Sequence, residues 1–316
     1  MGLSSGKCYA STRLDNKTVV ITGCNTGIGK VTARELYKLG ARVVMACRDI
    51  KKAEEAADDI KSTVANQEHK DLGEVVVQKL DLSSLTSVRE CAKILLETER
   101  HIDILINNAG VMMCPYASTE DGFEMQFGTN HLGHFLFTCL LLPRIISSAP
   151  SRIITLSSVA HARGQIDFDD LNWKKRSYSP MAAYGQSKLA NVLFSKELAR
   201  RLGDRKVTTY ALHPGVIRTE LGRHMDSVYF KGSRQLAATL GYFFYKTLDQ
   251  GAQTTLHCAL DQDLGSQTGL YYSDCITKEP SAVAKDEEVA RRLWEESARL
   301  TGVDWDPVTA EDVTHT

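Results

Sequence analysis

The chain has 316 residues, of which 38 are Lys or Arg and 39 are Asp or Glu, giving a formal net charge of −1. This balance argues against a nucleic-acid-binding role, which needs concentrated positive charge. Hydrophobic residues at 43% and charged residues at 24% exclude wholesale disorder. The 22 glycines and 7 prolines are scattered, which excludes a collagen-like or low-complexity chain.

The first residues, MGLSSGKCYAS, lack the apolar core of a signal peptide. The longest apolar stretch, 132–146, contains His134, Pro143 and Arg144 and is too short to span a bilayer. These features predict a protein that is either cytoplasmic or peripherally associated with a membrane. The eight cysteines form no CxxC pair and show no regular spacing to histidines, so we expect free thiols and no metal site.

Short β-branched runs alternate along the chain with segments whose apolar residues recur at helical spacing. In chain order these predict a strand at 17–22, a helix at 27–39, a strand at 41–46, a helix at 50–65, a strand at 74–80, a helix at 84–99 capped by Ser83 or Ser84, a strand at 101–106, one or two helices over 119–147, a strand at 151–156, a helix at 181–202, a strand at 206–212, a helix at 248–260, a strand at 269–272 and a helix at 286–300.

This alternation predicts an α/β fold, because consecutive parallel strands need crossover helices. We expect a single doubly wound, Rossmann-like domain with a mainly parallel sheet flanked by helices. No Pro/Gly/Ser-rich linker interrupts the pattern. The predicted organisation is an N-terminal extension, 1–14, a nucleotide-binding catalytic domain, 15–275, and a C-terminal helical tail, 276–316.

The first strand runs into the glycine-rich segment TGCNTGIG, residues 22–29, which opens the first helix. Glycine allows a sharp turn and lets a pyrophosphate approach the backbone, and the helix N-terminus offers free N–H groups. The location between a strand and a helix predicts a dinucleotide site. Its expected cofactor contacts are Gly23, Asn25, Thr26, Gly27, Ile28 and Gly29.

The end of the second strand bears on the choice of cofactor. NAD-binding sheets place an acidic residue near this point for the ribose hydroxyls, whereas Cys47 stands here and Arg48 follows. The planar fork of Arg48 suits a 2′-phosphate, so we expect NADP(H). Asp49 leaves open the alternative that its carboxylate binds the ribose of NAD(H).

Several motifs together resemble the short-chain dehydrogenase/reductase family over residues 15–275. They are the three glycines, the NNAG segment 107–110, Asn130, Ser158 and the Tyr184-x-x-x-Lys188 pair. Further stretches are similar to the retinol dehydrogenase branch of that family, namely 108–116, 130–135, 149–161, 187–202 and 290–294. Membership of that branch implies a preference for NADP(H), in agreement with Arg48.

The resemblance also implies catalytic roles. Tyr184 would be the general acid or base, and Lys188, one helical turn away on the same face, would lower its pKa and bind the nicotinamide ribose. Ser158 would polarise the substrate carbonyl oxygen. Asn130 would hold a water in a proton relay toward Lys188.

The remaining cofactor contacts come from the ends of other strands. The resemblance places Asp81 and Leu82 beside the adenine, Asn107, Ala109 and Gly110 along the adenosine side, and Pro214, Gly215 and Thr219 over the nicotinamide. A substrate lid is expected over 221–248, and the segment 159–180 is expected to form a wall of the substrate pocket.

The combined prediction is an NADP(H)-dependent oxidoreductase that interconverts a lipophilic aldehyde or ketone and its alcohol, with retinal and retinol favoured. A steroid or general carbonyl reductase of the same family is the first alternative, and a nucleotide-binding sensor or scaffold without turnover is the second. The segments 119–147 and 181–202 resemble helices that family members bury in dimers, so a homodimer is expected.

Overall fold

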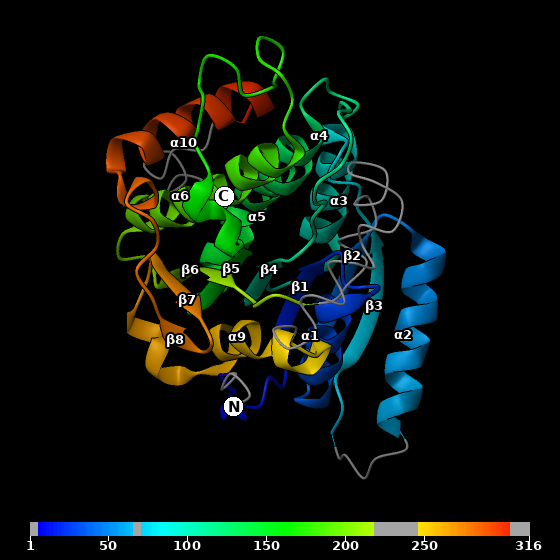
Figure 1. Ribbon diagram of the computed structural model, residues 1–316. Helices are drawn as coiled ribbons and strands as arrows, with labels where there is room; N and C mark the ends of the chain where they lie inside the picture. The colour runs from blue at the N-terminus through cyan, green and yellow to red at the C-terminus, as the bar shows by residue number, and fades with distance from the viewer. Residues whose placement is uncertain (1–5, 66–70, 218–245, 304–316) are drawn as a thin grey trace, which may run out of the picture.

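The computed structural model describes residues 6–65, 71–217 and 246–303. They form one α/β domain in which a central sheet lies between two layers of helices (Figure 1). The order of the strands in the sheet is β3-β2-β1-β4-β5-β6-β7-β8, and all neighbours are parallel except β7 and β8. The predicted fold class is therefore confirmed.

The strands are β1 (Thr18–Thr22), β2 (Arg42–Cys47), β3 (Glu74–Lys79), β4 (Ile104–Asn107), β5 (Ser151–Leu156), β6 (Val207–His213), β7 (Leu270–Ser273) and β8 (Ile276–Thr277). The principal helices are α1 (Gly27–Lys38), α2 (Ile50–Ala65), α3 (Leu85–Thr98), α4 (Met125–Phe127), α5 (Gly133–Ser147), α6 (Pro180–Leu202), α9 (Leu248–Leu260) and α10 (Glu287–Thr301).

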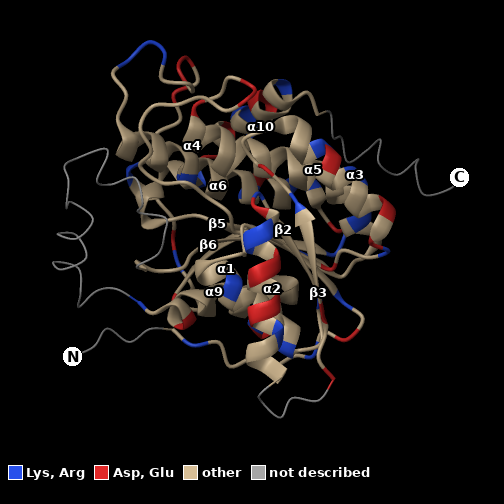
Figure 2. Ribbon diagram, turned by 90° about the vertical axis from the view of Figure 1, so that its right-hand side faces the viewer, with Lys and Arg blue, Asp and Glu red and all other residues tan. Residues whose placement is uncertain are grey.

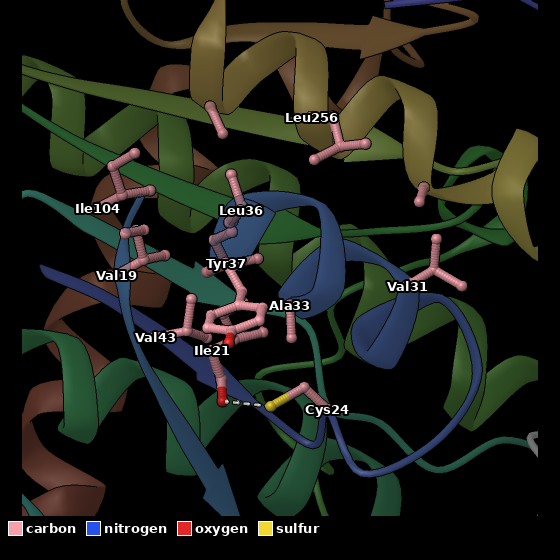
Figure 3. Packing of buried hydrophobic residues seen from close by; sticks show 14 of the residues in the cluster. Val19, Ile21, Cys24, Val31, Ala33, Leu36, Tyr37, Val43, Ile104 and Leu256 are labelled. Carbon is pink, nitrogen blue, oxygen red and sulfur yellow. Dashed lines mark hydrogen bonds between the residues drawn. The ribbon is translucent and has the colours of Figure 1, made fainter. Parts of the chain in front are cut away.

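Both faces of the sheet are buried, which explains why its strands are almost uninterrupted apolar runs. Successive side chains of β1 point to opposite faces. Val19 and Ile21 join the core under α1 and α9, where they meet Leu36 and Leu256 (Figure 3). Val20 faces the other way and joins the core under α3 and α5.

The segment 119–147 holds two helices, which is one of the two predicted arrangements, but the first begins later than predicted. Residues 118 and 124 form an isolated antiparallel bridge, and the helix starts only at Met125. The buried Glu124 sets this start, because its carboxylate accepts hydrogen bonds from the backbone N–H groups of Gln126 and Phe127. A π-helical turn, Gly128–Leu132, then separates α4 from α5. Apolar periodicity alone could not reveal this turn.

The C-terminal segment belongs to the same packed unit. The short strand β8, which was not predicted, pairs with β7 just beyond residue 275. Helix α10 lies across α6 and α5, and the ring of Trp294 contacts the rings of Phe194 and Phe135 at centroid distances of 5.9 and 4.9 Å. The guanidinium of Arg201 lies 4.6 Å from the Trp294 ring centroid.

The surface carries charges of both signs, and α2 displays acidic and basic residues along one helix (Figure 2). All eight cysteines lie in the described residues, and none of them forms a disulfide. In the part of the chain that the structure describes, no cluster of three or more His, Cys, Asp or Glu side chains is arranged to bind a metal. None of the helices within 6–65, 71–217 and 246–303 combines the length and apolar character needed to cross a bilayer.

Candidate active site

The candidate site lies where the carboxyl ends of β1, β4 and β5 come together. These three strands are neighbours in the sheet. From β1 to β3 successive strands are added on one side of the sheet, and from β4 onward they are added on the other side. Open α/β sheets bind ligands at such a switch point. The glycine-rich segment after β1, the NNAG segment after β4 and the serine pair after β5 therefore lie at one edge of the sheet.

The glycine-rich segment is packed tightly against the NNAG segment. Gly23 has φ +61°, and a Cβ at this position would lie 2.7 Å from the Cβ of Ala109. A Cβ at Gly29 would lie 2.5 Å from Nδ2 of Asn108. Glycine is required at both positions, the first for its conformation and both for the close approach.

The N-terminus of α1 is suited to an anion. Its N-cap residue, Thr26, makes no side-chain capping hydrogen bond, and the first turn contains no acidic residue. The free N–H groups and the positive end of the helix dipole therefore meet no competing negative charge. With the glycines, this arrangement fits a pyrophosphate held by Gly23, Asn25, Thr26, Gly27, Ile28 and Gly29.

Two cationic side chains lie at the ends of β2 and β3. The Arg48 side chain is 65% exposed, and its Nε lies 4.0 Å from Oδ2 of Asp81. Nζ of Lys79 donates a hydrogen bond of 2.5 Å to the carbonyl oxygen of Arg48. Lys79 was not predicted, because its proximity to Arg48 depends on the pairing of β2 with β3.

The alternative ribose ligand, Asp49, is engaged with α2. Its Oδ1 accepts a hydrogen bond of 3.1 Å from the backbone N–H of Lys52, and its Oδ2 lies 3.7 Å from Nζ of the same residue. Cys47 is buried, with its Sγ 3.9 Å from that of Cys24. The last residue of β2 therefore presents a buried thiol in place of an acid.

Ser158, Tyr184 and Lys188 meet beside the end of β5. The hydroxyl of Ser158 lies near enough to the phenol of Tyr184 to lower the pKa of that phenol. Nζ of Lys188 lies 5.8 Å from the Tyr184 ring centroid and donates a hydrogen bond of 3.0 Å to the carbonyl oxygen of Leu156. Ser157 fixes α6 from the opposite side, since its hydroxyl donates to the carbonyl oxygen of Lys188 at 2.7 Å.

Burial shifts the pKa values of both Tyr184 and Lys188. It raises the pKa of Tyr184 to about 12, against a smaller lowering by the nearby hydroxyl of Ser158. It also lowers the pKa of Lys188 to about 8. With its pKa raised in this way, the phenol of Tyr184 is protonated at neutral pH.

Asn130 lies in the π-helical turn and is fully buried. Its Oδ1 accepts from the backbone N–H of Val111 at 2.8 Å, and its Nδ2 donates to the carbonyl oxygen of Val111 and to Oγ of Ser187, each at 2.9 Å. A Cβ at Gly110 would lie 3.3 Å from Oδ1 of Asn130 and 3.6 Å from Nζ of Lys188. Asn130, Gly110 and Lys188 are therefore neighbours.

Other predicted cofactor contacts lie around the same edge. Asp81 follows β3, where its Oδ1 accepts hydrogen bonds from Ser83, and Leu82 is buried. Pro214 and Gly215 follow β6, and Gly215 has φ +101°. Thr219 and most of the expected lid, 221–245, lie outside the described residues.

The side chain of Asn107 steadies the edge of the sheet. It is fully buried, and its Nδ2 donates to Oγ1 of Thr138 on α5 at 2.9 Å. Its side chain therefore joins β4 to α5 beneath the sheet edge. Asn108 was not among the predicted site residues, yet its Nδ2 donates to the carbonyl oxygens of Thr22 and Gly23 at 2.8 and 3.1 Å.

Comparisons with known proteins agree with this geometry. The short chain dehydrogenase family matches residues 17–228. Human retinol dehydrogenase 13 is 52% identical over 305 residues, which cover 96% of this chain and 89% of that protein. Human retinol dehydrogenase 11 is 51% identical over 301 residues, covering 95% and 91% of the two chains.

Solved structures show the same fold. The crystal structure of an uncharacterized protein from Mycobacterium paratuberculosis is similar, with a TM-score of 0.73, 38% identity and coverage of 94% of this chain and 98% of that one. An NAD(P)-dependent gluconate 5-dehydrogenase from Beutenbergia cavernae, at 22% identity with a TM-score of 0.64 and coverage of 83% and 96%, supports the fold alone.

The chain therefore belongs to the short-chain dehydrogenase family, whose members are oxidoreductases that bind NAD(P). Within that family it is retinol dehydrogenase-like, with the relatives named retinol dehydrogenases 11 to 14 at about half identity.

Proposed function

We propose that this protein is an NADP(H)-dependent retinal reductase or retinol dehydrogenase, with Tyr184 as the group that exchanges a proton with the substrate oxygen. The observation that carries the proposal is the contact of Tyr184 with Ser158 and its proximity to Lys188, at the sheet edge that holds the phosphate-binding segment. The identity of about 50% to retinol dehydrogenases supports a retinoid as the substrate.

The protein's own groups have distinct tasks. The protonated phenol of Tyr184 donates its proton to the carbonyl oxygen in reduction and, once ionised, accepts one in oxidation. The Ser158 hydroxyl orients and polarises that oxygen. The ammonium of Lys188 stabilises the phenolate that remains after donation, and Asn130 orders the route by which the proton is replaced.

The bound nicotinamide supplies or accepts the hydride. Besides the residues of the glycine-rich segment, we assign Asp81, Leu82, Ala109, Gly110, Pro214, Gly215 and Thr219 to the cofactor, with Tyr184 and Lys188 at the nicotinamide ribose. Arg48, supported by Lys79, is assigned to the 2′-phosphate. A planar guanidinium that is largely exposed, with a second cation at the backbone carbonyl of the same residue, suits that doubly charged group.

The substitution Tyr184→Phe tests this assignment. We expect kcat/KM for retinal reduction to fall by roughly 10²- to 10⁴-fold, because a general acid is lost, while NADPH still binds. Tyr210→Phe is the matched control, since it removes the hydroxyl of another buried tyrosine, whose partner is the carbonyl oxygen of Leu264. Full activity of Tyr184→Phe would refute the role.

Substrate identity is tested separately, by comparing kcat/KM for all-trans-retinal, a steroid ketone and a short aldehyde. Retinal should have the highest value. A higher value for the steroid or the short aldehyde would favour a steroid or general carbonyl reductase. NADPH binding without turnover of any of the three would favour a nucleotide sensor.

A further inference from the structure

His134 is a buried residue to which neither the family motifs nor the proposed chemistry gives a task. It lies in the first turn of α5, only 1% exposed, between the end of β1 and the π-helical turn that carries Asn130. Its Nε2 lies 2.8 Å from Oγ1 of Thr22, and its Nδ1 lies 2.9 Å from the carbonyl oxygen of Asn130.

The proton positions on this imidazole follow from its neighbours. The hydroxyl of Thr22 accepts hydrogen bonds from the backbone N–H groups of Asn108 and Ala109, at 3.0 and 2.9 Å. These occupy both lone pairs of a hydroxyl oxygen, so its single hydrogen must point to Nε2 of His134. Nε2 is therefore the acceptor, and Nδ1 carries the proton that is donated to Asn130.

The neutral state fits the surroundings. Burial lowers the pKa of His134 to about 4, a value that includes a smaller rise from the hydrogen bond to Asn130 and a small lowering by the nearby charge of Lys188. A neutral imidazole with its proton on Nδ1 satisfies both partners. A proton on Nε2 instead would face the Thr22 hydroxyl hydrogen and leave the Asn130 carbonyl without this donor.

The hydrogen bonds of His134 close a ring around the NNAG segment. Thr22 holds the N–H groups of Asn108 and Ala109, while the side chain of Asn130 holds both the N–H and the carbonyl of Val111. Hydrogen bonds thus hold residues 108–111 at both ends. His134 is hydrogen-bonded to both Thr22 and Asn130, and so connects the two ends. Gly110 lies between these ends and faces Asn130 and Lys188.

We propose that His134 is a positioning residue that couples the threonine at the start of the phosphate-binding segment to Asn130, and so fixes the NNAG segment against Lys188. It touches neither substrate nor cofactor and acts through Thr22 and Asn130. The proposal rests on the proposed function for its kinetic consequence, whereas the direction of the hydrogen bonds is independent of the reaction.

The kinetic experiment compares His134→Leu with His131→Leu. Both remove a buried imidazole from neighbouring turns, but Nε2 of His131 bonds to Oγ of Ser297 on α10, away from the NNAG segment. We expect kcat for retinal reduction to fall about tenfold to hundredfold in His134→Leu relative to His131→Leu, because the reacting groups are misplaced. KM for retinal should not change.

His134→Gln should recover part of the lost kcat, since its amide keeps one acceptor and one donor. Equal kcat values for His134→Leu and His131→Leu, or no recovery in His134→Gln, would overturn the positioning role.

The spectroscopic experiment needs no activity. In nitrogen-15 histidine spectra of the wild-type protein at pH 7, the signals that vanish in His134→Gln should show a neutral ring with the proton on Nδ1. A proton on Nε2, or a charged ring, would overturn the inference. If wild-type protein reduced no aldehyde, the proposed function would fail while this measurement still decided the orientation of His134.

Discussion

Lys188 determines how the activity should depend on pH. Burial lowers its pKa to about 8, so the ammonium is lost as the pH rises through that value, while Tyr184, with a pKa of about 12, keeps its proton. We therefore expect kcat/KM for retinal reduction to be flat below neutral pH and to fall above pH 8. A pH–rate profile between 6 and 10 measures this.

Lys188→Arg separates the charge of this residue from its other contacts. A guanidinium stays protonated over the same range, so the decline near pH 8 should disappear even if the activity is lower throughout. A decline that persists unchanged in this variant would show that another group titrates.

Arg48 and Lys79 should set the choice of cofactor together. We expect Arg48→Glu to weaken NADPH binding about tenfold to hundredfold, since a charge-assisted contact with the 2′-phosphate is replaced by repulsion, and to affect NADH far less. Lys79→Gln should shift the preference in the same direction by less. Titration of each variant with both cofactors measures this. Lys93→Gln, on the exposed face of α3, is the control, and equal losses for NADPH and NADH would contradict the assignment.

How much of this site the sequence could predict depends on how each residue is positioned. Tyr184 and Lys188 share one helix, and Ser158 follows one strand, so short motifs identify them. Lys79 becomes relevant only because β3 pairs with β2, and His134 only because α5 passes the end of β1. Such contacts depend on the tertiary arrangement, which local spacing does not contain.

The helices and strands also differ in whether a local sequence pattern or a tertiary contact determines them. The strands were predicted because buried parallel strands are short β-branched runs, and α2 was predicted with its observed bounds, 50–65. The start of α4 and the π-helical turn were missed. The first is set by the buried carboxylate of Glu124, and the second leaves the apolar pattern unchanged. The strand β8 is two residues long, too short for any periodicity.

Helix α10 contributes to the packing of α6, the helix that carries Tyr184 and Lys188. Its Trp294 is buried against α5 and α6. We expect Trp294→Ala to lower the free energy of unfolding by about 3–5 kcal/mol, as for other large aromatic side chains removed from cores. Urea denaturation measures the loss. Arg291→Ala, on the exposed face of the same helix, should change it little, and an equal, small effect of both would show that α10 is not part of the core.

The same packing bears on the number of subunits. The homodimer expected from the segments 119–147 and 181–202 requires that both helices offer free faces to a partner. In the structure, α6 is buried from Ala183 to Leu193 without a break, and α5 from Gly133 to Cys139. Trp294 of α10 packs against Phe135 of α5 and Phe194 of α6.

We therefore expect a homodimer of this protein to form through α10 or through another face, and not through α5 and α6 directly. A stable interface typically buries about 800 Å² on each partner, and α10 already occupies the surface that these helices would contribute. Light scattering at micromolar concentration measures the mass. A dimeric mass that Trp294→Ala leaves unchanged would place the interface on another face, whereas a dimer that this substitution abolishes would make α10 itself the contact.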